Sequence, residues 1–492
     1  RGIVWTSPPV HNGHFVWANP FNGNLACETF SEHGELATGE ALQMTQTFTI
    51  IRDAGAWCRE QNMPVPFHDA DLAALPEPDH HGKRSTLRPL SRGERWHREN
   101  GLFFSGWYAP EIDDSEQFEP YRALYPYALP SNRQSIRNAE LLDSAGMPWM
   151  FIQEHGPFMD REHWRSGTLP DVPREREVGY MVDEDVLWQR DLPTGRVSQE
   201  LVRVSRARQA RPEALTAIAF HAWNRQYGCI RLADFAQPDI VVGEVYPFLH
   251  RWDHKGSFFW QIGWAREAGM RTHRPWWNFT QTFGNADPGE GGNNARLPGG
   301  SEQRLQVFAA LAWGYTGFLD YYYSLTPKYY ERGSVPFLVT PEGEPTEAYH
   351  RHRQIIRETM NLGRGLSQLR HIDAGQWDER HRVLRGLGVD VDEAPVTIGR
   401  FCDDSGDDSY FMITNTQSHA EKSAEELAET ITLRVAPARD LLRLDRLTGE
   451  VVRHELEPGP DGGAATLTLT LPGGTGTLLK IDNGRPFALL TK

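Results

Sequence analysis

The sequence predicts an α/β fold: a (β/α)8 TIM barrel followed by a C-terminal antiparallel β-sandwich. Up to about residue 360, short apolar segments alternate with helix-like segments, which indicates βαβ units around a parallel sheet. Beyond residue 372 the pattern changes to short alternating segments separated by Asp, Gly and Pro, as in a sandwich. A chain of 492 residues also exceeds one ordinary core. We therefore expect a barrel domain over residues 1–371 and a sandwich domain over residues 372–492.

The elements follow from local patterns. We expect the first barrel strand in the segment up to Pro66, and the other seven over residues 102–108, 149–152, 178–183, 215–220, 239–247, 274–279 and 316–323. Helices are expected over residues 131–144, 198–208, 259–267, 302–313 and 348–369, and the last of these closes the barrel. The predicted sandwich strands are 396–401, 410–415, 430–435, 441–444 and 467–471.

Composition excludes several classes of function. A formal charge of -15 argues against nucleic acid or an anionic membrane as the partner. The four cysteines are far apart and form no CxxC, which argues against a zinc ribbon or a redox pair. We find no P-loop, no G-x-S-x-G elbow and no metal-ligand spacing, and therefore expect neither a metal nor an organic cofactor. No run of 18 apolar residues predicts a transmembrane helix.

The sequence does not decide the cellular location of the protein or its oligomeric state. The sequence opens at Arg1 without a leader, as a mature or trimmed form would, so the chain is either extracellular or cytoplasmic, with a lean to secretion. The sequence carries no readable interface signal that decides whether the chain forms a homo-oligomer. It contains 16 Trp, 15 Tyr and 23 Phe, and aromatic faces of this kind both stack on sugar rings and fill cores.

One predicted strand ends in three consecutive acids, Asp183, Glu184 and Asp185. Crowded carboxylates raise one another's pKa values, and a carboxyl group that keeps its proton near neutral pH can act as a general acid. The carboxyl end of a barrel strand is also where catalysis is expected. Glu154 and Glu244 follow the third and sixth predicted strands, and Asp320 lies in the eighth.

Two carboxyl groups at a barrel mouth suit glycoside hydrolysis, in which one serves as the acid and the other as the base or nucleophile. The alternative interpretation is structural, because acids in this position also pair with arginines or cap helices. Three adjacent acids on a buried strand favour the catalytic interpretation for Asp183 and Glu184.

Three motifs carry a family resemblance. Asp183-Glu184 lies where the retaining clan that includes family 42 β-galactosidases has an Asn-Glu pair, whose Glu is the acid/base. Val245-Tyr246-Pro247 is similar to the Tyr-Pro of strand six in that clan, and residues 301–318 are similar to its helix before strand eight. The tail over residues 411–481 also looks like the C-terminal β-domain of these enzymes. The chain thus resembles the (β/α)8 glycoside hydrolases over most of residues 100–485.

One position departs from that clan. Its nucleophile Glu lies at the end of strand seven, and the matching residue here is Gln281, whose amide cannot form a glycosyl ester. Glu244 is then the second carboxylate, or the strand alignment is wrong, or the substrate supplies its own nucleophile. The last alternative is similar to substrate-assisted N-acetylhexosaminidases of families 20 and 123, in which an Asp-Glu pair works with Tyr and Trp residues.

The resulting prediction is a glycoside hydrolase that acts on an oligo- or polysaccharide, with carbohydrate as its only expected partner. Glu184 is the expected proton donor, Asp183 tunes that acid or orients an acetamido group, and Glu244 is the expected second carboxylate. The residues expected to bind substrate are Tyr246, Trp276, Trp277, Gln281, Trp107, His155, Glu154 and Asp320. The alternatives are a substrate-assisted N-acetylhexosaminidase, a catalytically inactive glycan-binding barrel, which the amide of Gln281 would favour, and a metal-dependent hydrolase on the same fold.

Overall fold

The computed structural model of the chain describes four strands before residue 52 and most of the chain from residue 88 onward. The described ranges are 88–107, 109–110, 115–129, 135–152, 175–183, 211–221, 236–250, 255–286, 294–324, 333–459 and 463–490, with residues 204, 207, 208 and 233. Seven parallel strands form the central sheet: β5 (Phe103–Gly106), β6 (Trp149–Ile152), β7 (Glu177–Asp183), β8 (Leu215–His221), β9 (Ile240–Glu244), β10 (Trp276–Gln281) and β11 (Gly317–Tyr321).

The central sheet is curled: β11, which comes last in the chain, pairs with β5, which comes first. The order is β5-β11-β10-β9-β8-β7-β6, and every neighbouring pair is parallel. Between the edge strands β5 and β6, Ala128 forms a parallel bridge to Trp149, and the Ser105 hydroxyl donates to the Tyr127 carbonyl at 2.9 Å. The described residues thus form a half-barrel of seven regular strands, one fewer than the sequence predicts.

The expected first barrel strand before Pro66 is not found among the described residues of that segment, which end at Ile51. In that segment the structure has β1 (Gly2–Thr6), β2 (His14–Ala18), β3 (Leu25–Thr29) and β4 (Thr47–Ile51). These strands form two antiparallel pairs, β1 with β4 and β2 with β3, and none of them pairs with the parallel sheet. Within the described ranges, the parallel sheet begins at β5. Apolar strand patterns alone do not reveal which strands will pair.

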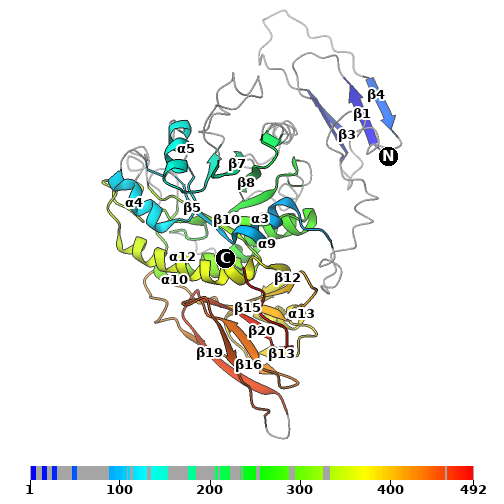
Figure 1. Cartoon of the computed structure of the whole chain (residues 1–492), viewed down its shortest axis with the longest axis vertical. Helices are drawn as coiled ribbons and strands as arrows, with labels where there is room; N and C mark the ends of the chain where they lie inside the picture. The colour runs from blue at the N-terminus through cyan, green and yellow to red at the C-terminus, as the bar shows by residue number, and fades with distance from the viewer. Residues whose placement is uncertain are drawn as a thin grey trace, which may run out of the picture.

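Six longer helices accompany the sheet: α3 (Arg92–Asn100), α4 (Ser115–Leu124), α5 (Ser135–Ser144), α9 (Lys255–Thr272), α10 (Gly300–Ala312) and α12 (Glu347–Leu366). α3 begins in a capping box, since Ser91 and Glu94 each bind the other's backbone NH, and it ends at Gly101, whose φ of 86° suits glycine. Figure 1 shows α10 and α12 between the parallel sheet and the C-terminal strands. α10 is buried all round because it contacts β10 on one side and β14 and β15 on the other.

The C-terminal part contains two antiparallel sheets, as the sequence predicts. Its strands are β12 (Leu369–Gln376), β13 (Val389–Val391), β14 (Val396–Asp403), β15 (Tyr410–Asn415), β16 (Glu429–Val435), β17 (Leu441–Leu444), β18 (Val451–His454), β19 (Ala465–Leu471) and β20 (Gly476–Ile481), and the short η5 (Trp377–Glu379) and α13 (Arg380–Val383) follow β12. The sheet orders are β12-β14-β15-β20-β17-β18 and β13-β16-β19. Side chains of both sheets share one apolar cluster, which includes Phe411, Leu479 and Leu433. The domain boundary at residues 371 and 372 stays a prediction, and β12 spans it.

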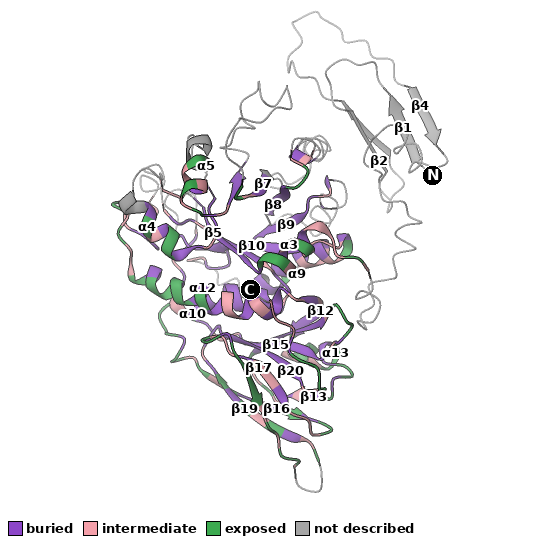
Figure 2. Cartoon of the chain, in the orientation of Figure 1, coloured by how far each residue is buried: buried purple, intermediate pink, exposed green. Residues whose placement is uncertain are grey.

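The two faces of the parallel sheet have different partners. Side chains alternate along a strand, so neighbours in sequence point to opposite faces. Trp277 and Val242 belong to an inner cluster made mainly by the strands and by segments that connect them, whereas Trp276 and Val241 pack against the helices. Buried residues follow the strands and α10, as Figure 2 shows in purple.

A buried ion cluster joins α10 and α12 to the C-terminal sheets. Glu358 of α12 is buried and forms ion pairs with Arg304 of α10 and with Arg446, which follows β17, at 2.9 Å from the Arg446 Nε. The Arg304 Nε also donates to the Thr475 hydroxyl at 2.6 Å, and Gln354 donates to the other Glu358 oxygen at 2.9 Å. Glu358 therefore compensates two arginines contributed by two different parts of the fold.

His97 of α3 lies against the inner cluster at the amino-terminal ends of the parallel strands. Its Nε2 accepts a hydrogen bond from the Trp277 Nε1 at 2.9 Å, and its Nδ1 lies 2.7 Å from the Gly101 carbonyl oxygen. Because an indole NH can only donate, the proton of neutral His97 must be on Nδ1. Burial lowers the pKa of His97 from 6.5 to about 4, so the ring is neutral in the folded protein at pH 7.

This neutral histidine predicts a loss of stability in acid. Between pH 6.5 and pH 4 the unfolded chain binds a proton at residue 97 that the folded chain does not, so stability falls as the pH falls. We expect His97 to contribute roughly 2 kcal/mol of the decrease in unfolding free energy between pH 7 and pH 5. Urea unfolding of the native protein and of His97→Gln at both pH values measures this, because Gln keeps a donor and an acceptor but does not titrate. Equal pH dependence in the two proteins would contradict it.

Candidate active site at the carboxyl ends of the parallel strands

Glu244 is the last residue of β9 and a buried carboxylate with a relative exposure of 5%. Its backbone pairs with His221 of β8 on one side and with Phe279 of β10 on the other, so it lies inside the sheet and away from either edge. The Tyr246 hydroxyl donates to the Glu244 Oε2 at 3.5 Å. This places an acid and a phenol together at the carboxyl end of the sheet, which is the catalytic face of barrel enzymes.

Aromatic rings gather at the same end of the sheet. The rings of Tyr246 and Tyr321 stack with centroids 5.6 Å apart and planes 23° apart, and Phe283 meets both of them edge to face. Trp107, which follows β5, lies with its ring centroid 6.0 Å from that of Tyr321. Tyr321 keeps partial exposure. The structure thus brings the predicted Tyr246 and Trp107 into one aromatic group with Tyr321 and Phe283.

Sequence reasoning missed Tyr321 and Phe283. A signal for Tyr321 was present, since the run Tyr321 to Tyr323 stands at the end of the last predicted strand. Phe283 carried no comparable signal, because it follows β10 in a segment that has no local pattern of its own.

Gln281 is the last residue of β10, and its side chain is fully buried. Its Nε2 donates to the carbonyls of Phe248 at 2.9 Å, Arg296 at 2.8 Å and Phe283 at 3.3 Å. Its Oε1 accepts from the Phe248 backbone NH at 2.9 Å. One amide thus ties together the chain after β9, the chain after β10 and the segment before α10. A carboxylate here would face three carbonyl oxygens without a donor, so this position suits glutamine and disfavours glutamate.

Three predicted residues lie away from Glu244. Trp276 and Asp320 are on the helix-facing side of the sheet, opposite to Trp277, because side chains alternate. The Trp276 Nε1 donates to the Trp313 carbonyl at 3.1 Å, and Asp320 accepts from the Tyr125 hydroxyl at 2.7 Å. Trp277 faces inward but lies two residues before Phe279, the backbone partner of Glu244, and so about 7 Å below Glu244 along the strand, where its indole NH binds His97. The structure does not bring these three residues to Glu244.

The remaining predicted residues fall at the limits of the described chain. Asp183 is the last residue of β7, and its backbone pairs with Ile218 of β8, while its side chain is outside the described part. Glu184, Glu154 and His155 lie outside the described residues. Only β8 separates β7 from β9, so these strands run about 10 Å apart across the sheet. Asp183 pairs with Ile218, which pairs with Val241, so Asp183 lies three residues below the level of Glu244.

Within the described ranges, no group of three or more His, Cys, Asp or Glu side chains is arranged to hold a metal ion. Among the helices of those same ranges, none combines the length and the apolar character needed to cross a bilayer.

Comparison with known proteins finds no protein-family model and no curated protein that matches the chain. Several solved structures are similar in shape. A β-galactosidase from Bacillus circulans sp. alkalophilus aligns with 78% of this chain and 99% of its own, at 8% identity and a TM-score of 0.46. A glucosidase from Croceicoccus marinus aligns with 78% of this chain and 95% of its own, at 11% identity and a TM-score of 0.39. A β-galactosidase from the psychrophilic Marinomonas ef1 aligns with 55% of this chain and 62% of its own, at 11% identity and a TM-score of 0.40.

Those three structures are glycosidases by their descriptions. The resemblance to family 42 and to families 20 and 123 stays a prediction.

Proposed function

We propose that this protein is a glycoside hydrolase whose active site lies at the carboxyl ends of β7, β9, β10 and β11. The observation that carries the proposal is Glu244, a buried carboxylate at a strand end. Its partner Tyr246 stacks on Tyr321, an aromatic ring that reaches solvent. Aromatic faces offer a surface for the CH groups of a sugar, and a carboxylate in an apolar environment acts strongly on charge that develops nearby.

In this proposal Glu184 donates the proton to the departing glycosidic oxygen, and Asp183 next to it tunes that acid. Glu244 is the second carboxylate and acts as nucleophile or as base toward water. The sheet order supports the assignment, because only β8 lies between β7 and β9, and carboxylates that follow these two strands face the same end of the sheet. Tyr246, through its hydroxyl 3.5 Å from the Glu244 Oε2, holds the carboxylate in place. The reaction needs no cofactor.

One observation favours a second candidate, a substrate-assisted N-acetylhexosaminidase. The end of β10 carries Gln281, whose amide is fully used by backbone groups, so no carboxylate acts from that strand. A reaction without a nucleophile on β10 can use Glu244, or it can use the acetamido group of the substrate with Asp183 orienting it.

A panel of aryl glycosides tests the proposal and separates the two candidates. Each sugar is supplied in both anomeric forms and with either a hydroxyl or an acetamido group at carbon 2. Hydrolysis of a 2-hydroxyl glycoside supports Glu244 as the second carboxylate, and the anomeric form of the product, followed by NMR, shows whether configuration is retained or inverted. Hydrolysis confined to 2-acetamido sugars supports the substrate-assisted reaction. A protein that binds oligosaccharides but hydrolyses no member of the panel would be a glycan-binding barrel, and the proposal would fail.

A further inference from the structure

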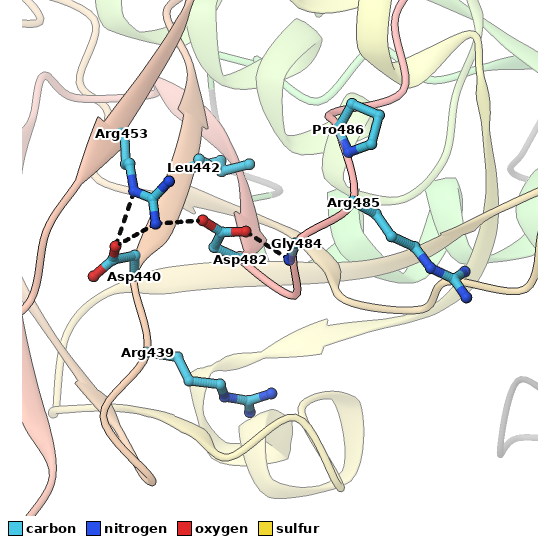
Figure 3. Close-up of a pocket in the computed structure, with 8 residues that line it drawn as sticks. All are labelled: Arg439, Asp440, Leu442, Arg453, Asp482, Gly484, Arg485 and Pro486. Carbon is cyan, nitrogen blue, oxygen red and sulfur yellow. Dashed lines mark hydrogen bonds and ion pairs between the residues drawn. The ribbon is translucent and has the colours of Figure 1, made fainter.

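A cavity of about 720 Å³ lies in the C-terminal part of the chain, far in sequence from the strand ends. It is lined by the beginning of β17, by Arg453 of β18 and by the turn that follows β20. Figure 3 shows the lining residues, with Arg453 between Asp440 and Asp482 and with Arg439 and Arg485 turned away from that group.

The two acidic side chains that line the cavity, Asp440 and Asp482, already have hydrogen-bond and ion-pair partners. The Arg453 Nε donates to the Asp440 Oδ2 at 2.9 Å, and the Arg453 Nη2 lies 2.9 Å from the Asp482 Oδ2. The other oxygens of these acids accept from the backbone NH of Leu456 at 3.1 Å and of Gly484 at 2.9 Å. The hydrogen bond from Arg453 also lowers the pKa of the Asp440 carboxyl, which keeps it ionised. These acids therefore build the wall of the cavity and leave little capacity for a cationic ligand.

The guanidinium groups of Arg439 and Arg485 retain N–H donors that a ligand can use. Within the described part of the chain neither forms an ion pair: the Arg439 Nη2 donates to the Leu387 carbonyl at 2.8 Å and the Arg485 Nη1 donates to the Ser405 hydroxyl at 3.1 Å. The Arg439 Nε is buried and has no hydrogen-bond partner among the same residues. The cavity thus has a net positive charge on a chain whose formal charge is -15. An anion is the ligand that such a lining favours.

The turn that carries Arg485 is fixed before any ligand arrives. Lys480 is fully buried, and its Nζ donates to the carbonyls of Arg485 at 2.8 Å and Pro486 at 3.0 Å. The same ammonium group lies 3.1 Å from the Asp407 Oδ2, which compensates its charge. Gly484 supplies the positive φ of 79° that the turn requires. A binding group held in place in this way loses little entropy on binding.

We propose that this cavity binds a carboxylated sugar residue, a uronate, with its carboxylate at Arg439 and Arg485. The planar fork of a guanidinium matches the two oxygens of a carboxylate. The cavity is widely open to solvent, and its volume of about 720 Å³ is more than one inorganic anion fills. Leu442 and Pro486 also line it and offer apolar contact to a sugar ring. Only the choice of a sugar as the ligand rests on the proposed hydrolase function.

Calorimetric titration of the full chain with sodium trigalacturonate tests the proposal, with the neutral trisaccharide galactotriose and sodium phosphate titrated in parallel. We expect trigalacturonate to bind, and to bind more weakly as the ionic strength rises. Arg439→Gln and Arg485→Gln should each weaken binding about tenfold, since each removes a charge-assisted hydrogen bond. Arg485→Lys keeps the positive charge but lacks the planar pair of N–H donors. Its affinity for trigalacturonate should therefore lie between those of the native protein and Arg485→Gln. Arg434→Gln, which removes an exposed arginine of β16, is the matched control and should bind normally.

Three results would overturn the proposal: equal affinity for galactotriose, equal affinity for phosphate, or unchanged binding in both arginine variants with native melting temperatures. The outcome is separable from that of the proposed hydrolase. Arg439→Gln and Arg485→Gln lie outside the candidate active site and should hydrolyse a small aryl glycoside at the native rate. A chain that hydrolyses glycosides but does not bind trigalacturonate refutes this cavity alone. A chain that binds trigalacturonate through these arginines but hydrolyses nothing refutes the hydrolase alone.

Discussion

Replacement of Glu184 by Gln should lower kcat/KM on an unactivated aryl glycoside by about 10²–10⁴-fold, the usual contribution of a general acid. Gln has nearly the same shape but no acidic proton, so the departing oxygen would leave as an unprotonated anion. Sugar binding should persist, because the substituted group acts on the bond that breaks. The decline in rate on the alkaline side of the pH profile, which reports loss of the proton from the acid, should disappear in this variant.

The leaving group separates the roles of the two carboxylates. A 2,4-dinitrophenyl glycoside departs without protonation, so Glu184→Gln should recover most of its rate on that substrate. Glu244→Gln should stay slow on both substrates, since a good leaving group does not replace a nucleophile or a base. Rates of the native protein and both variants on the two glycosides, with the Kd of a non-hydrolysed oligosaccharide as the binding control, give the complete test. A native rate in Glu184→Gln on the unactivated glycoside would exclude its assignment as the acid.

Glu358→Ala should destabilise the protein by about 3–5 kcal/mol, the cost of removing one partner from a buried charge cluster. The substitution leaves Arg304 and Arg446 close together with no carboxylate between them, at the junction of α10, α12 and the C-terminal sheets. Desolvation opposes the two uncompensated charges, and their mutual repulsion adds to the effect. Urea unfolding monitored by Trp fluorescence gives the change in free energy.

Glu347→Ala provides a matched control on the same helix. Glu347 pairs with Arg351 one turn along α12, and its side chain has a relative exposure of 87%. Solvent screens an exposed pair of this kind, so its removal should cost at most about 0.5 kcal/mol. If Glu358→Ala proved no more destabilising than Glu347→Ala, the cluster would contribute nothing to the junction.

Local patterns in the sequence were sufficient to locate most elements. The apolar runs near residues 149, 215, 240, 276 and 317 all form parallel strands, and the expected antiparallel strands after residue 396 are also present. Apolar runs and turn residues act over a few positions, so they are visible without knowledge of the fold. Such runs do not reveal which strands pair: β1–β4 pair with one another and not with the parallel sheet, because pairing depends on partners distant in the chain.

Local patterns also located part of the candidate site, but not all of it. The sequence placed Glu244 and Tyr246 at a strand end because both follow an apolar run directly. It could not separate Trp277 from Trp276, since a shift of one residue moves a side chain to the opposite face of the sheet. It also could not show why residue 281 is an amide, because the carbonyls that Gln281 binds belong to Phe248, Phe283 and Arg296.

The sequence by itself determined the alternation of strands and helices, the antiparallel C-terminal strands and the position of Glu244 at the end of a strand, because these depend on short-range periodicity. Only the tertiary structure decided that β11 pairs with β5, that Tyr321 and Phe283 surround Tyr246, and that Arg439 and Arg485 line one cavity with Arg453. These contacts join residues tens to hundreds of positions apart, and the physical cause is packing, in which each side chain's neighbours are set by how the sheet curls and which face it presents.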